Sequence, residues 1–241
     1  MLSTALQFSG GKDSLATLHL WDAMHGLDST LVMWVNTGQA YDEVIEVMRK
    51  TKARVPHFLE IKSDVTASIK RHGYPSDIVP IINTSIGLAT NPTFRGPMIQ
   101  SWASCCGENI WAPLHQAVMD RGIKCVVRGQ RTDELMTSPI QSGFVDQFGI
   151  EYIMPLETWS AAEVFQYLRE NNIDSPEYYA KGETTSRDCW SCTAYMHHGS
   201  IDRINDLPLA KRRVVKSRLQ EIRVAVEREH KGISEAIGHG C

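Results

Sequence analysis

The sequence predicts an α/β fold, in which a mostly parallel, twisted sheet carries helices on both faces and a helical C-terminal segment follows. The first half of the chain alternates apolar stretches of strand length with stretches of helical character: strands at 4–9, 30–35 and 57–61, and helices at 13–25 and 41–53. Such a βαβαβ order favours parallel strands that are connected through helices. A glycine pair directly after the first strand marks a tight strand-to-helix turn.

The elements of the second half follow from periodicity and capping residues. We expect a helix at 109–121 and strands at 125–128 and 152–154. Ser160 then begins another helix, because it is a suitable N-cap and Glu163 three residues later completes a capping box. Residues 73–102 contain four prolines and are expected to form a long irregular loop, either a lid or a mobile excursion.

The C-terminal part has the pattern of an amphipathic helix. Between about 207 and 233 one apolar stripe contains Val215, Leu219, Ile222 and Val226. We therefore expect residues 1–195 to form the α/β domain, and residues 196–241 to form a helical segment with a tail.

Composition and charge exclude several classes of protein. Hydrophobic residues make up 42% of the 241 residues and charged residues 22%, which is an ordinary globular balance. The net charge of −3 argues against binding nucleic acid over the whole surface. No apolar run is long enough to cross a bilayer, and the first apolar stretch is too short for a secretory leader, so we expect a cytoplasmic protein without membrane contact. In a reducing compartment, paired cysteines favour metal or redox chemistry over structural disulfides.

The turn after the first strand has the composition of a phosphate-binding loop. It reads Ser9-Gly10-Gly11-Lys12-Asp13-Ser14. Glycines allow backbone amides to approach a ligand, the start of a helix favours an anion, and a lysine can reach a phosphate. The alternative is a turn without a ligand. The spacing differs from that of a Walker A loop.

This loop resembles the pyrophosphate loop of the adenine nucleotide α-hydrolase-like (PP-loop) superfamily, and further motifs resemble the phosphoadenosine phosphosulfate reductase family within it. These motifs are Val35-Asn36-Thr37-Gly38 followed by Tyr41 and Glu43, Gly129-Gln130-Arg131 with Glu134, and Pro155-Leu156 with Trp159. Together with the carboxyl ends of the strands, where such sheets place ligands, the resemblance implies an adenine nucleotide site formed by Phe8, Ser9, Gly10, Gly11, Lys12, Asp13, Ser14, Val35, Asn36, Thr37, Gly38, Gly129 and Arg131.

Four of the six cysteines form two close pairs. Cys105 and Cys106 are adjacent, and Cys189 and Cys192 frame Cys-Trp-Ser-Cys. Four thiolates can hold zinc or an iron–sulfur cluster, and adjacent ligands suit a cluster better than a single zinc ion. Buried free thiols and a Cys189–Cys192 redox pair are the alternatives. Cys125 is expected in the core.

The cysteine pattern resembles the [4Fe-4S] signature of the adenylylsulfate-type reductases, which implies that Cys105, Cys106, Cys189 and Cys192 hold such a cluster. Two features depart from that pattern. The lysine that usually follows the first pair is missing between Cys106 and Pro113-Leu114, and the pyrophosphate loop is intact, as in family members that cleave ATP.

The last residue, Cys241, follows Gly238-His239-Gly240. The reductases that this chain resembles use a cysteine near the C-terminus as nucleophile, which implies a catalytic role for Cys241. The glutamate that precedes that cysteine in the family is absent here, so an inert terminal thiol is the alternative.

Residues 211–231 contain eight lysines or arginines and three glutamates. This basic stretch is expected to be the solvated face of a helix. A patch facing the nucleotide and a contact with nucleic acid are the alternatives.

The resemblance implies three candidate functions. The first is an iron–sulfur sulfonucleotide reductase that converts adenylylsulfate or phosphoadenylylsulfate to sulfite and AMP or its 3′-phosphorylated form, with thioredoxin or a glutaredoxin-like dithiol as reductant. The second is an ATP pyrophosphatase-type sulfur transferase that acts on tRNA or DNA. The third is a nucleotide-binding redox sensor. A homo-oligomer is compatible with each of them.

Overall fold

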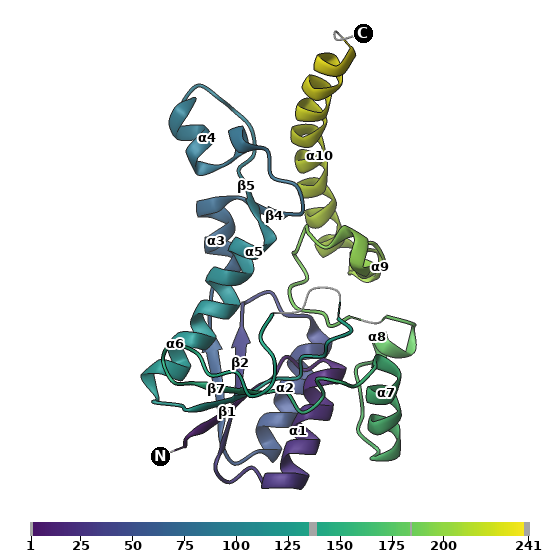
Figure 1. Cartoon of the computed structure of the whole chain (residues 1–241). Coiled ribbons are helices and arrows are strands. Elements are labelled where there is room, and N and C mark those ends of the chain that lie inside the picture. Colours follow the sequence, from purple (N-terminus) through teal and green to yellow (C-terminus); the bar gives the residue numbers. More distant parts are fainter. Residues whose placement is uncertain (1, 135–138, 184, 239–241) are drawn as a thin grey trace. The chain divides into compact units, whose positions relative to one another are not determined.

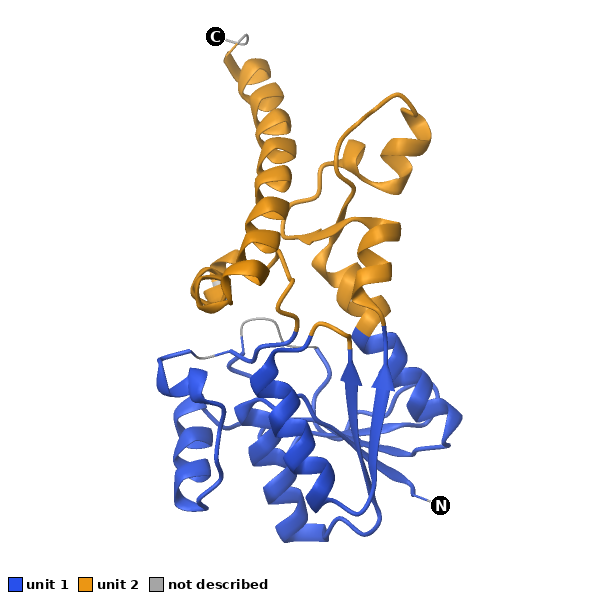
Figure 2. Cartoon of the chain, turned by 180° about the vertical axis from the view of Figure 1, so that it is seen from behind, with its two compact units in different colours: residues 1–36, 40–63, 110–188 blue, residues 37–39, 64–109, 189–241 orange. Residues whose placement is uncertain are grey.

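The computed structural model describes residues 2–134, 139–183 and 185–238 (Figure 1). The chain forms two compact units (Figure 2). The loop unit contains residues 1–36, 40–63 and 110–188, and the cysteine unit contains residues 37–39, 64–109 and 189–241. This division differs from the single boundary after residue 195 that the sequence suggests, because the chain passes between the units several times.

The loop unit is built on a five-stranded sheet with the order β3-β2-β1-β6-β7. Its strands are β1 (Thr4–Gln7), β2 (Thr30–Asn36), β3 (Phe58–Lys62), β6 (Cys125–Val127) and β7 (Glu151–Ile153). All four neighbouring pairs are parallel, which confirms the predicted sheet. All five strands begin and end within two residues of their predicted bounds, and β2 and β3 each end one residue later than predicted, at Asn36 and Lys62.

Helices flank this sheet. They are α1 (Lys12–His25), α2 (Asp42–Arg54), α6 (Ala112–Asp120), α7 (Ala161–Glu170) and α8 (Glu177–Ala180). The capping box predicted at Ser160 and Glu163 is present at the start of α7. Ala16 of α1 packs with Val164 and Leu168 of α7 in one apolar cluster.

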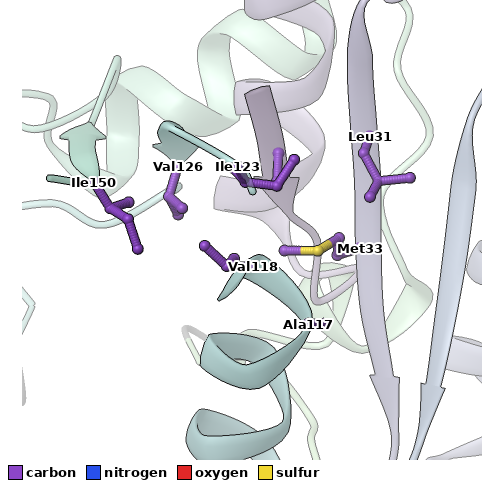
Figure 3. Packing of buried hydrophobic residues seen from close by; sticks show 8 residues of the cluster. Leu31, Met33, Ala117, Val118, Ile123, Val126 and Ile150 are labelled. Atoms are coloured by element: carbon purple, nitrogen blue, oxygen red, sulfur yellow. The ribbon is translucent and has the colours of Figure 1, made fainter. Parts of the chain in front are cut away.

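A second apolar cluster covers the sheet face under α6 (Figure 3). Figure 3 shows Met33 of β2 and Val126 of β6 pointing toward Val118 of α6. Ile123, which leads from α6 into β6, is 2% exposed in the same cluster. Burial of these side chains fixes α6 on the sheet, and with it the start of β6.

The cysteine unit contains a two-stranded parallel sheet and several helices. Its elements are α3 (Val65–His72), β4 (Tyr74–Ser76), a 3₁₀ turn (Ile81–Asn83), α4 (Ser85–Thr90), β5 (Ile99–Ser101), α5 (Trp102–Cys106), a π-helical turn (Met196–Ser200), α9 (Ile201–Asp206) and α10 (Leu209–Gly238). Another π-helical turn, Gly107–Trp111, precedes α6. Ile222 and Ala225 of α10 pack against Ile99 of β5.

One prediction for this region was wrong. The stretch 73–102 is not an irregular loop, because β4 and β5 pair in parallel and α4 lies between them. The prolines concealed this order, and Pro75 itself lies in β4. The helix predicted at 109–121 is present, and its first turn is the π-helical turn that leads directly into α6. No helix in the described part of the chain is long and apolar enough to span a bilayer.

Candidate functional site

The glycine loop joins β1 to α1 in the loop unit, as the sequence predicts. Gly10 has a φ of +79°, which a residue with a side chain rarely adopts. Gly11 is the N-cap of α1 and supplies no side chain to the first helical amides. Ser14 Oγ donates to the Gly11 carbonyl at 2.9 Å, and Ser9 Oγ donates to Ser14 Oγ at 3.3 Å. The loop is therefore held by its own hydroxyl groups.

The first amide of α1 has a partner that lies far away in the sequence. Lys12 N donates to the hydroxyl of Tyr179, in α8, at 3.0 Å. A Cβ at Gly11 would lie 3.0 Å from the same hydroxyl and 2.9 Å from Cβ of Ser186. The segment that contains Tyr179 and Ser186 therefore covers one side of the loop.

Charged and aromatic groups hold this covering segment in place. Arg187 is 4% exposed, and its guanidinium pairs with Glu183 and, at 3.5 Å, with Glu43. The guanidinium also stacks on the ring of Tyr178, at 4.7 Å from the ring centroid. Burial raises the pKa of the Tyr178 phenol to about 12. Burial also raises the pKa of Tyr179, so both phenols are neutral at physiological pH.

The loop lysine is buried against its own neighbour. The Lys12 side chain is 2% exposed, and its Nζ lies 2.5 Å from Asp13 Oδ2. The other oxygen of Asp13 accepts a hydrogen bond from Nε of Arg131 at 2.7 Å. Arg131 also pairs with Asp133, and with Glu134 at 3.7 Å. Burial raises the pKa of Glu134, and the nearby Asp13 carboxylate raises it further.

Gly129 is placed directly against α1. A Cβ at this position would lie 2.9 Å from the carbonyl carbon of Asp13 and 2.9 Å from Oγ1 of Thr17. The glycine is required by this close approach of the two backbones. The structure thus brings Gly129 and Arg131 to the glycine loop, as the sequence-based site requires.

The ends of β1 and β2 lie beside each other. Phe8 N donates to the Met33 carbonyl at 2.8 Å, and Val35 is 9% exposed. Asn36 Nδ2 donates to Glu60 at 2.8 Å. Thr37 and Gly38, the next two residues of the predicted nucleotide site, belong to the cysteine unit.

All four paired cysteines belong to the cysteine unit. Cys105 and Cys106 end α5, which follows β5 without a break, and Ser101 caps this helix by accepting from Ser104 N at 3.0 Å. Cys189 and Cys192 lie in a turn in which Cys192 N donates to the Cys189 carbonyl.

Hydrogen bonds tie the second pair to the same small sheet. Thr193 Oγ1 donates to the Pro75 carbonyl in β4 at 2.5 Å, and Trp190 N donates to the Gln39 carbonyl at 2.8 Å. Sγ of Cys189 lies 3.3 Å from Oγ1 of Thr37. Because β4 pairs with β5, one sheet positions both cysteine segments.

The two cysteine segments also interact through side chains. Sγ of Cys106 lies 3.7 Å from the hydroxyl of Tyr195, whose ring is 5.0 Å from that of Trp102. Burial raises the pKa of the Cys105 thiol to about 11, and Cys192 contributes to this shift. Among the described residues, however, no three His, Cys, Asp or Glu side chains are arranged as a ready group of metal ligands.

Glu108 occupies the region where the family pattern has a lysine. It accepts from Ser68 Oγ at 2.5 Å and pairs with Arg71. The hydrogen bond from Ser68, together with Arg71 and His72, lowers the pKa of Glu108, so this position carries a negative charge.

The predicted nucleophile, Cys241, lies outside the described residues.

The basic stretch 211–231 lies in α10, and two of its cations contact the second cysteine segment. Lys211 lies 5.4 Å from the ring of Trp190, and Arg218 donates to the Ser191 carbonyl at 3.3 Å. These two cations therefore face the second cysteine segment, and a contact of α10 with nucleic acid stays a prediction. Cys125 lies in β6 but is only partly buried.

Sequence reasoning missed Tyr179, Arg187 and Asp133, and it did not pair Arg131 with Asp13, although both residues belong to the predicted site. Tyr179 and Lys12 are 167 residues apart, and Arg131 and Asp13 are 118 apart. Local spacing could have indicated only the near pairs: Asp133 and Glu134 lie two and three residues after Arg131, and Glu183 lies four residues before Arg187.

Solved structures of other proteins are similar to this chain. A crystal structure of phosphoadenylyl-sulfate reductase from Candida auris, in complex with phosphate, has a TM-score of 0.54 and 18% identity to this chain. The matched region covers 79% of this chain and 82% of the reductase chain. FMN adenylyltransferase from Candida glabrata, in complex with FMN and an ATP analogue, has a TM-score of 0.46 and 15% identity to this chain. The matched region covers 77% of this chain and 53% of the adenylyltransferase chain. No protein with a curated description matches the chain.

The first of these similarities shows a shared fold. The family assignment comes from the sequence, because residues 3–195 match the phosphoadenosine phosphosulfate reductase domain. This match covers most of the chain, including the glycine loop and both cysteine pairs. The chain therefore belongs to the phosphoadenosine phosphosulfate reductase family.

Proposed function

We propose that this protein is an iron–sulfur sulfonucleotide reductase, which reduces adenylylsulfate or phosphoadenylylsulfate to sulfite with electrons from a dithiol. The observation that carries the proposal is the placement of both cysteine pairs by one small sheet, in a chain whose family acts on sulfonucleotides.

The glycine loop would bind the anionic part of the nucleotide. Its glycines place no side chain between the loop backbone and a ligand, and the start of α1 favours negative charge. The Lys12 amide already donates to the Tyr179 hydroxyl, so the ligand would use other groups of the loop. Lys12 and Arg131 now hold Asp13 between them, so an incoming phosphosulfate would compete with this carboxylate for both cations. The adenosine would lie at the carboxyl ends of β1 and β2, where parallel sheets bind ligands.

Cys105, Cys106, Cys189 and Cys192 would hold a [4Fe-4S] cluster. Thiolates are the ligands that such clusters require, and a buried polar atom supports this fit. Ser191 lies between Cys189 and Cys192, is 1% exposed, and its Oγ has no hydrogen-bond partner among the described residues. An acceptor such as a cluster sulfide would satisfy this hydroxyl. When bound, the cluster supplies a local charged centre and joins the two cysteine segments.

The chemical step assigned to this chain is nucleophilic. The Cys241 thiolate would attack the sulfur of the sulfonucleotide, forming an S–S bond while the bond from sulfur to the phosphate oxygen breaks and AMP or its 3′-phosphorylated form leaves. One thiolate of thioredoxin or a glutaredoxin-like dithiol would then attack Sγ of Cys241, which releases sulfite and leaves a mixed disulfide. The second thiol of the reductant would attack this disulfide, which regenerates the Cys241 thiol and leaves the reductant as a disulfide. The two electrons therefore come from the dithiol.

Product analysis tests this proposal. The protein is purified without oxygen and incubated with thioredoxin and adenylylsulfate, phosphoadenylylsulfate or ATP in separate reactions. Sulfite from either sulfonucleotide is expected, and Cys241→Ser should abolish it, whereas Cys125→Ser should leave it unchanged. Unaltered sulfite release by Cys241→Ser would remove this thiol from the mechanism.

The cluster is tested separately by composition. About four iron and four sulfide per chain are expected in the anaerobically purified protein. Cys105→Ser and Cys192→Ser should lose most of the iron, while Cys125→Ser should retain it. Stoichiometric zinc, or equal iron in all three variants, would contradict the assignment.

A second candidate is an ATP pyrophosphatase-type sulfur transferase that acts on tRNA or DNA. The intact loop, with Lys12 and Asp13 at the start of α1, favours it. Pyrophosphate released from ATP in the same experiment, without sulfite from the sulfonucleotides, would support this candidate. If neither sulfite nor pyrophosphate is formed, the result would favour a redox sensor.

A further inference from the structure

Arg128 lies at the edge of the sheet where the glycine loop begins. It directly follows β6, in which Val127 is in register with Leu6 of β1. Arg128 is therefore next to the end of β1, and Gly129, the following residue, abuts the backbone of Asp13. Parallel sheets of this kind bind their ligands at the carboxyl ends of the strands.

The cations of the loop unit near α1 differ in how they are neutralised. Lys12 and Arg131 both contact Asp13, and Arg187 pairs with Glu183 and Glu43. The guanidinium of Arg128 has no hydrogen bond or ion pair with any of the described residues, although its backbone N–H donates to the Ile153 carbonyl.

The Arg128 guanidinium is partly buried as well as unpaired within the described part of the chain, which favours a bound anion. The side chain is half-buried, and this burial lowers the pKa of the guanidinium, with Tyr152 and Glu134 acting only through longer-range electrostatics. A cation that is withdrawn from water without a partner is destabilising, and a bound anion removes that cost. A guanidinium is also suited to paired contacts with phosphate or sulfate oxygens.

We propose that Arg128 binds the anionic phosphate or phosphosulfate group of the adenine nucleotide, so that it is a binding residue in addition to the glycine loop. This proposal rests on the function proposed above. In this arrangement Arg128 acts together with Lys12 and Arg131, and it differs from them because the ligand does not have to displace Asp13 from it.

Equilibrium binding to a series of nucleotides tests the role of Arg128. Dissociation constants for adenosine, AMP, ATP and phosphoadenylylsulfate are measured by calorimetry for the wild type, Arg128→Gln and Arg128→Lys. Loss of one charge-assisted contact should weaken binding of ATP and phosphoadenylylsulfate about 10- to 100-fold. Adenosine should bind equally to all three proteins, and Arg128→Lys should show a smaller loss, because it keeps the charge without the paired geometry.

The control is Arg121→Gln, which removes an exposed arginine at the end of α6 whose guanidinium donates to the Ala117 carbonyl. It should bind every nucleotide as the wild type does. If Arg128→Gln binds ATP and phosphoadenylylsulfate normally, or loses affinity equally for adenosine, the role of Arg128 is overturned while the proposed function stands. If the wild type binds no adenine nucleotide, the proposed function fails, and the role of Arg128 fails with it.

Discussion

Arg131→Gln should destabilise the loop unit, because Arg131 joins the glycine loop to the segment after β6. Its side chain is 5% exposed, that of Asp13 is 17% exposed and that of Asp133 is 47% exposed. Removing one partner from a buried ion pair costs about 3–5 kcal/mol, whereas an exposed pair contributes about 0–1 kcal/mol. Because Asp13 retains Lys12, we expect the lower end, about 3 kcal/mol.

This loss corresponds to a fall in unfolding temperature of roughly 6–12 °C for a chain of this length. Urea denaturation followed by far-ultraviolet circular dichroism measures the free energy of unfolding. Asp133→Asn is the matched control, since it removes the exposed partner of the same arginine and should cost about 1 kcal/mol or less. A loss below about 1 kcal/mol for Arg131→Gln would refute the argument that its ion pairs hold the loop.

Three further perturbations test the fold and the electrostatics of the site. Ser160→Ala should lower the free energy of unfolding by about 1 kcal/mol, through loss of the α7 cap, and no change in urea denaturation would contradict the cap. Ile123→Ala should cost about 2–5 kcal/mol, since this side chain is 2% exposed in the core under α6, and a cost under about 1 kcal/mol would argue against that packing. The pKa of Glu134 is raised in the folded protein, so the protonated Glu134 side chain stabilises the fold at low pH and this contribution is lost as pH rises from 4.5 through the folded-state pKa. The stability of the wild type should therefore fall relative to that of Glu134→Gln over this pH range. Denaturation at a series of pH values checks the sign, and a difference that does not vary with pH would contradict it.

Elements that depend on local sequence could be predicted. The strand, glycine turn and helix around Gly10 and Gly11 follow from apolar periodicity and from the freedom of glycine at positive φ. The start of α7 follows from the capping residues Ser160 and Glu163. The parallel sheet follows from the alternation of the two patterns, and the structure confirms it.

Elements that depend on distant partners could not be predicted. The strand β4 contains Pro75 and is stable because it pairs with β5, whose Ile99 packs on Ile222 of α10. The residues of the candidate site divide in the same way. Loop residues are recognisable as a motif. No local pattern reveals that the Tyr179 hydroxyl accepts a hydrogen bond from the Lys12 amide, or that Arg128 has no carboxylate partner within the described part of the chain.

A single-turnover experiment with sulfur-35-labelled phosphoadenylylsulfate and adenylylsulfate tests the proposed reaction most directly. In the absence of a dithiol, about one equivalent of label should remain bound to the anaerobically purified protein, at Cys241, with release of one equivalent of AMP or its 3′-phosphorylated form. Added thioredoxin should then release this label as sulfite. A protein that never retains label, although the same preparation binds the nucleotide, would contradict the proposal.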